Sequence, residues 1–207
     1  LIKKIEKKIQ LIDEQKISLI NQHFTKGIIP NVEMKDSGVE WIGEIPKHWN
    51  YLPLKYITSD HNGIKTGPFG TQLNSKDYKK NGIKVLNQQT LINEDYSIGD
   101  NYISTEKFDE LKTFNVKSGD LIMGTRGSFG KKNRTTFGKC SIVPDSNQIY
   151  VLHPCLIRIR LLDKKISKDY FLKMINLSSI FLESIKNSSN ATTIEVIYGV
   201  DLKDIKL

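Results

Sequence analysis

The sequence predicts an α+β protein in which one long helix precedes a strand-rich body with short helices. Three observations support this class. Apolar residues recur with a seven-residue repeat near the start of the chain. After residue 54, short apolar runs alternate with Gly, Pro, Asn and Asp clusters, as in a chain of short strands and turns. Serine and threonine residues stand where N-caps of short helices are expected between those runs.

The first expected element is a helix that ends at Gly27, because Pro30 follows shortly after it. Residues on one face recur at alternating spacings of three and four, which are the a and d positions of a coiled coil. This seam consists of Ile2, Ile5, Ile9, Ile12, Lys16, Leu19 and His23. We expect it to contact a partner helix, and packing of the helix against its own domain is the alternative. No N-cap residue precedes Leu1, so we expect the natural helix to extend further upstream.

Residues 28–53 contain three prolines and both tryptophans of the chain, which excludes a long helix there. We expect an extended linker that docks through Trp41, Trp49 and Tyr51. The sequence is therefore divided into a helix at 1–27, a linker and docking segment at 28–53, and a mixed domain at 54–207.

Within this domain the apolar runs predict strands at 83–88, 121–123, 140–143, 149–153, 155–162 and 194–197. Short helices are expected after Ser75, after Ser104 or Thr105, and after Ser167, the last with an apolar stripe that runs to Ile185. A type I turn at 67–70 is expected to expose Phe69, for which a buried position is the alternative. Arg158 and Arg160 share one strand face, which we interpret as solvated.

Composition favours a polyanionic partner. The chain has 207 residues, 31 Lys and Arg against 23 Asp and Glu, a net charge of +8 and a pI near 9.3. No apolar stretch approaches the roughly 18 residues of a membrane span, and no signal-peptide pattern opens the chain. Cys140 and Cys155 are predicted to be reduced core residues, which favours a cytoplasmic location.

The most informative segment is 119–134, where a buried strand leads into a glycine-rich loop with four cations. These cations are Arg126, Lys131, Lys132 and Arg134, and no acidic residue occurs from 121 to 144. Unpaired cations beside glycines, which let a backbone approach closely, suit a phosphate backbone. A solvated basic hairpin tip is the alternative that this loop alone does not exclude.

The sequence shows no catalytic or metal-binding pattern. A P-loop needs glycine five residues before its Gly-Lys pair, and Thr125 stands at that place before Gly130. The histidines His23, His48, His61 and His153 lack metal-ligand spacing. No nucleophile elbow is present either.

Taken together, these blocks resemble the specificity subunits of type I restriction-modification systems. Segment 35–49, followed by Leu54-Lys55, is similar to the stretch that introduces a target recognition domain in this family. The family's other recurrent motifs are matched, in order, at 66–73, 119–122, 126–131 and 190–195. The resemblance extends over essentially the whole chain.

The resemblance implies a fragment that contains the end of the central conserved helix and the second target recognition domain. It implies a non-catalytic, sequence-specific double-stranded DNA-binding protein that serves defence against foreign DNA. Modification subunits would supply S-adenosylmethionine-dependent adenine methylation. A restriction subunit would supply ATP- and Mg-dependent translocation and cleavage. Without its partner helix, the isoleucine seam would favour self-association.

The resemblance also implies DNA contacts from two loops and the strand end beside them. The expected contacts are Phe69, Thr71, Gln72, Gln88, Gln89, Arg126, Ser128, Lys131, Lys132 and Arg134. Gln88 and Gln89 suit bidentate contact with adenine, and Arg126 with guanine. Lys131 and Lys132 suit phosphates. The alternatives are the recognition region of a fused methyltransferase-endonuclease, and a helix-mediated assembly module with an incidental basic face.

Overall fold

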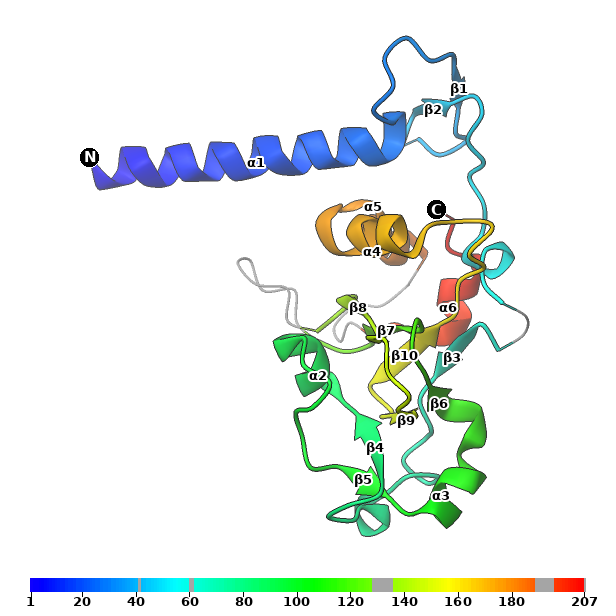
Figure 1. Cartoon of the computed structure of the whole chain (residues 1–207). Coiled ribbons are helices and arrows are strands. Elements are labelled where there is room, and N and C mark those ends of the chain that lie inside the picture. Colours follow the sequence, from blue (N-terminus) through cyan, green and yellow to red (C-terminus); the bar gives the residue numbers. More distant parts are fainter. Residues whose placement is uncertain (41, 60–61, 128–135, 189–195, 207) are drawn as a thin grey trace.

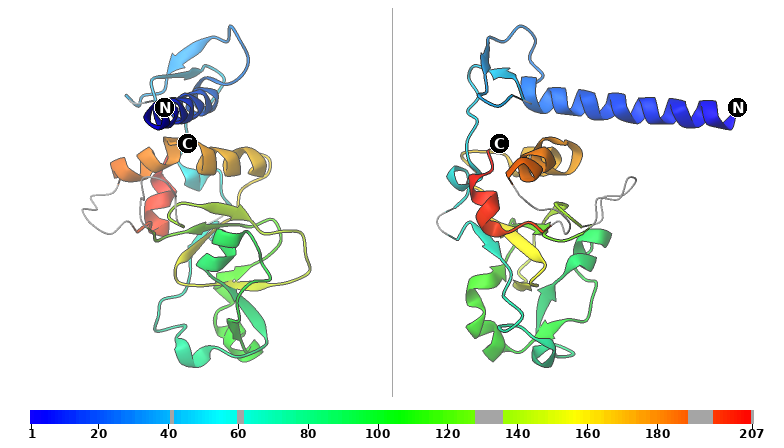
Figure 2. Two further views of the ribbon diagram at one scale, coloured as in Figure 1. Left: turned by 90° about the vertical axis from the view of Figure 1, so that its left-hand side faces the viewer. Right: turned by 180° about the vertical axis from the view of Figure 1, so that it is seen from behind.

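The computed structural model describes residues 1–40, 42–59, 62–127, 136–188 and 196–206. A long helix lies across one end of a mixed α+β body, and two short helices separate it from the sheets (Figure 1). Two further views show the same order of helix, helical layer and sheets (Figure 2). The predicted class, α+β with a long helix before a strand-rich body, is confirmed.

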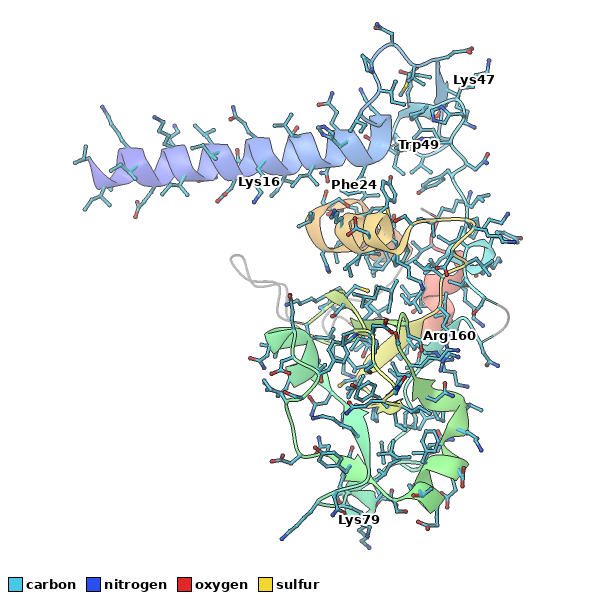
Figure 3. The ribbon with its side chains drawn as sticks, viewed as in Figure 1. Lys16, Phe24, Lys47, Trp49, Lys79 and Arg160 are labelled. Carbon is cyan, nitrogen blue, oxygen red and sulfur yellow. The ribbon has the colours of Figure 1, made fainter. Side chains whose placement is uncertain are left out.

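Helix α1 (Ile2–Lys26) ends at Gly27, as predicted, where φ is 74° and only glycine is unstrained. None of its residues is buried. It contacts the body near its C-terminal end, where Phe24 meets Tyr170 edge to face at a centroid distance of 5.2 Å (Figure 3). Asn21 exchanges two hydrogen bonds with Ser179, at 2.8 and 3.0 Å. The helix is therefore docked by one short stretch of one face.

The segment after α1 contains a hairpin of β1 (Met34–Asp36) and β2 (Glu44–Pro46), in which Lys35 pairs with Ile45. The expected extended linker thus includes a small sheet. Trp49 packs on the end of α1, since its Cζ2 would lie 3.4 Å from a Cβ at Gly27. Trp41 lies outside the described residues, and the expected division at 27 and 53 stays a prediction.

Two four-stranded sheets form the body. The first has the order β3 (Ile64–Thr66), β10 (Leu156–Ile159), β7 (Leu121–Gly124) and β8 (Cys140–Ile142), all antiparallel. The second has the order β5 (Tyr102–Ile103), β4 (Ile83–Leu86), β9 (Tyr150–Leu152) and β6 (Asn115–Val116), with β4 and β9 parallel. Each strand predicted between 83 and 162 is present, and all but β7 are shorter than expected.

The helices of the body are short. They are α2 (Gln88–Asn93), α3 (Thr105–Glu110), α4 (Lys168–Leu177), α5 (Ile180–Ser188) and α6 (Gly199–Asp204), with 3-10 turns η1 (Leu54–Tyr56), η2 (Ser75–Asp77) and η3 (Lys112–Phe114). Ser104 and Ser167 cap α3 and α4 as predicted. Asn74, one residue before the expected Ser75, caps η2. The single helix expected to run to Ile185 is instead broken at Ser178.

β10 lies between two apolar cores. Ile157 and Ile159 belong to the first core with Phe171 and Phe181, whereas Leu156 belongs to the second with Val151. Both cysteines occupy the predicted buried positions, Cys140 in the first core and Cys155 in the second. The alternation of β10 therefore serves two cores rather than one core and solvent.

The interpretation of Arg158 and Arg160 as a solvated pair is wrong. Arg158 is 1% exposed and donates to main-chain oxygens of Thr113, Asn115 and Asn62. Burial, together with nearby Arg160, lowers the pKa of Arg158 to about 10. Arg160 forms a two-pronged ion pair with Asp120, at 2.7 and 2.9 Å. Since Asn115 belongs to β6 and Arg158 to β10, this polar cluster joins the two sheets.

Candidate nucleic-acid interface

Two of the sequence motifs reach the same end of the first sheet. β3 and β7 flank β10 and both run antiparallel to it, so their C-terminal ends lie beside the start of β10. Thr66 pairs with Ile157 on one side, and Gly124 pairs with Leu156 on the other. Two interstrand spacings, roughly 10 Å, separate the two strand ends. The Phe69 turn and the cationic loop therefore begin as neighbours.

A third motif crosses this end of the sheet. Val196 pairs with Arg126 in an isolated bridge, and the Ile197 N–H donates to the Thr125 oxygen at 2.9 Å. Two residues after Ile197, the Gly199 N–H donates to Thr66 Oγ1 at 3.1 Å. Residues 196–199 thus connect the exit of β7 with the exit of β3. The end of the predicted strand 194–197 is part of this crossing, and 189–195 lie outside the described residues.

The turn that carries Phe69 starts two residues later than expected. Phe69 itself occupies the first position, and its oxygen accepts the Gln72 N–H at 2.8 Å. Gln72 Oε1 accepts the Phe69 N–H at 3.0 Å, which closes the turn from both sides. Phe69 is 78% exposed, which excludes the buried alternative, and Thr71 and Gln72 are exposed beside it. All three side chains are accessible to a ligand.

The cationic loop is described at its two ends. Arg126 is exposed, whereas Thr136, in the segment that leads back to β8, is 3% exposed. The Thr136 hydroxyl donates to the Arg126 oxygen at 2.7 Å, which closes the loop at its base. The other predicted contacts in this loop, Ser128, Lys131, Lys132 and Arg134, lie outside the described residues.

The two predicted glutamines differ in what their amides do. Gln88 Nε2 donates to the Arg126 oxygen at 2.9 Å and to Thr136 Oγ1 at 2.8 Å. A bidentate adenine contact needs one amide N–H, and in this conformation Gln88 has none left. Gln89 is exposed, and its Oε1 accepts from Asn93 at 3.3 Å. Of the two, Gln89 has the side chain that can face a base.

Glycines at this end of the sheet allow close approach, but to the protein's own backbone. A Cβ at Gly124 would lie 2.0 Å from the Thr136 oxygen, and one at Gly67 would lie 2.1 Å from the His153 oxygen. Real Cβ atoms do not approach so closely, so both positions require glycine. These glycines are required because other main-chain segments pass close to them where the loops begin, and not because they contact a phosphate.

His153 belongs to this region and was not singled out in the sequence. Its main-chain N–H donates to the Leu86 oxygen at 2.9 Å, and its Nδ1 accepts the Cys155 N–H at 3.2 Å. Burial, and then the nearby charge of Arg126, lowers the pKa of His153. The imidazole is therefore held neutral beside an exposed cation. A lone histidine between two strands gives no sequence signal for this role.

The described residues contain neither a metal-binding cluster nor a membrane-spanning helix. Among these residues, no group of three His, Cys, Asp or Glu side chains could hold a metal ion. No helix among them has both the length and the apolar character that a bilayer crossing needs.

The chain is similar in sequence to one curated relative, the type I restriction enzyme MjaVIII specificity subunit of Methanocaldococcus jannaschii. The two share 23% identity over 179 residues, which is 84% of this chain and 38% of the relative. The chain therefore spans well under half of the relative's length. No family model matches it.

Two solved structures have similar chains. One, from work on complex assembly and conformational transition of the type I R-M system, has a TM-score of 0.58 and 12% identity, covering 99% of this chain and 42% of that one. The other, the crystal structure of a type I restriction-modification S subunit from M. genitalium, has a TM-score of 0.46 and 15% identity, covering 88% and 36%. The first shows that the fold is shared. The resemblance to type I specificity subunits is thus confirmed in sequence and in fold.

Proposed function

We propose that this chain binds double-stranded DNA sequence-specifically as a target recognition domain of a type I specificity subunit. The observation that carries the proposal is the meeting of the Phe69 turn, Arg126 and residues 196–199 at one end of the first sheet. Similarity to the MjaVIII specificity subunit supports the same function. An excess of cations, +8 over the chain, suits a DNA partner.

The exposed side chains at this end have the chemistry for reading a duplex. Arg126 suits the two acceptors of a guanine, and Gln89 suits the donor and acceptor of an adenine in the major groove. Phe69 supplies an exposed aromatic surface beside them. We assign phosphate contacts to Lys131 and Lys132, which would position the domain without specifying a sequence.

Catalysis is assigned to partner subunits. Modification subunits would methylate adenine with S-adenosylmethionine, and a restriction subunit would use ATP and Mg for translocation and cleavage. This chain would direct both activities to a target, in the cytoplasm where that DNA lies. The exposed seam of α1 would bind a second helix of the same kind, including one from another copy of this chain.

Selection from a pool of randomised DNA duplexes tests the proposal. We expect the purified chain to enrich a defined sequence, with binding that weakens as salt rises. Enrichment of no sequence at low salt would contradict sequence-specific recognition. If the chain also oligomerised and ignored duplex DNA, the assembly-module alternative would replace the proposal.

A further inference from the structure

Gln88 closes a network at the base of the cationic loop. Its amide nitrogen donates to the Arg126 oxygen and to Thr136 Oγ1, and the Thr136 hydroxyl donates to the same oxygen. The orientation of the amide follows from its partner, because a main-chain oxygen only accepts hydrogen bonds. The Arg126 oxygen therefore has two donors, Gln88 from α2 and Thr136 from the segment that leads back to β8.

The main chain around Arg126 is held on its other sides as well. Val196 pairs with Arg126, and Thr125 donates to the Cys155 oxygen at 3.0 Å and accepts from Ile197 at 2.9 Å. Arg126 nevertheless has an exposed side chain. A fixed backbone thus presents an exposed Arg126 side chain at the surface.

We propose that Gln88 is a positioning residue that acts on DNA recognition through Arg126, and does not itself contact a base. This inference rests on the proposed function. Bidentate recognition of guanine requires a guanidinium in the plane of the base edge, so a shift of the Arg126 backbone removes the contact. Gln88 fixes that backbone by hydrogen bonds to its carbonyl oxygen and to the hydroxyl beside it.

Gln89 provides a matched control on the same helix. Gln89 is exposed, and its side-chain amide nitrogen donates to no partner among the described residues. Its main-chain N–H donates to Asn87 Oδ1 at 2.8 Å. The two glutamines are therefore adjacent and chemically identical, but only Gln88 is bonded to the Arg126 backbone. The same substitution at both positions separates positioning from reading.

The experiment is a double-mutant cycle on DNA affinity, with the duplex that wild type selects from a randomised pool. Gln88→Met removes both donors at similar side-chain length, and Arg126→Ala removes the cation. We expect each to weaken binding about tenfold, and the double variant to bind within about twofold of Arg126→Ala. Binding to duplexes in which each base pair is changed in turn should show that both single variants lose their sequence preference at the same base pair. By contrast, the losses of DNA affinity caused by Gln89→Met and by Arg126→Ala should multiply in the double variant.

Multiplying losses for Gln88→Met and Arg126→Ala would overturn the inference and make Gln88 a base reader. So would unchanged binding by Gln88→Met, or a lost preference at a different base pair. A second cycle combines Thr136→Val with Arg126→Ala, leaves Gln88 unaltered and should give the same non-additive result. Thermal unfolding of each variant checks that it is folded. A wild-type chain that selects no sequence would instead refute the proposed function.

Discussion

The buried guanidinium of Arg158 provides hydrogen bonds that join the two sheets. It donates to oxygens of Thr113 and Asn115, which lie close together in the chain, and of Asn62, which lies far from them. Its Nε has no partner among the described residues. A charge at 1% exposure is tolerated only where such acceptors surround it, so the surrounding carbonyl groups also depend on it.

Arg158→Ala should lower the free energy of unfolding by about 3–5 kcal/mol, because it leaves buried acceptors unpaired and opens a cavity. Arg158→Lys retains the charge but not the planar fork, and should fall between wild type and alanine. Urea unfolding followed by circular dichroism measures both. A loss under about 1 kcal/mol for alanine would mean that the cluster is dispensable.

His153 should make the chain less stable in mild acid. Burial and Arg126 lower its pKa in the folded state, whereas the unfolded chain has a value of about 6.5. Below about 6.5 the unfolded state therefore binds more protons, so the free energy of unfolding falls as pH falls through this range. Thermal unfolding between about pH 7.5 and 5.5 should show a shallower decline for His153→Gln. Parallel curves would contradict this.

The sequence predicts the exposure of candidate interface residues better than it predicts the partners of polar residues that are wholly or partly buried. Arg126 and Phe69 follow from local rules, since a cation among glycines and an aromatic in a turn need no tertiary information. Gln88 and Arg158 do not, because their roles depend on partners far away in the chain. A polar residue in a short motif looks the same whether it faces solvent or closes a distant loop.

At the scale of elements, boundaries depend on side chains from other elements. Ser178 ends α4 while Ser179 is bonded to Asn21 of α1, a partner 158 residues away. α2 starts directly after β4 because Asn87 caps it, where the sequence suggests a continuing strand. Local caps such as Ser104 and Ser167 are predicted well, since cap and helix are contiguous.

Gly124 shows how closely the end of β7 approaches Thr136, in the segment that leads back to β8. Gly124→Ala places a Cβ 2.0 Å from the Thr136 oxygen, so the base of the cationic loop must shift. We expect a loss of roughly 1–3 kcal/mol in unfolding free energy, and weaker DNA binding. Gly70→Ala is the control, because no atom lies within 4 Å of its Cβ and its stability should change by less than about 0.5 kcal/mol. Equal effects at both positions would contradict the steric account.

At the scale of the whole molecule, α1 has two faces with different roles. On one face, Asn21 bonds to Ser179 between α4 and α5, and Phe24 packs on Tyr170 of α4. The predicted seam lies on another face, since its spacing places it about a third of a turn away. Its apolar members remain at least half exposed, from 50% at Ile5 to 73% at Ile2. Docking therefore leaves an exposed apolar stripe, interrupted by Lys16, available to a partner.

This surface predicts self-association of the chain through α1. Sedimentation of wild type should show a species heavier than the monomer that grows with concentration, because pairing would bury the seam. The double substitution Ile9→Lys with Ile12→Lys should abolish this heavier species, because it places two charges in the seam. Leu11→Lys is the matched control, because Leu11 is 49% exposed and apolar but lies outside the seam, roughly a third of a turn from it. A monomeric wild type, or equal loss with Leu11→Lys, would show that the seam does not mediate assembly of this chain with itself.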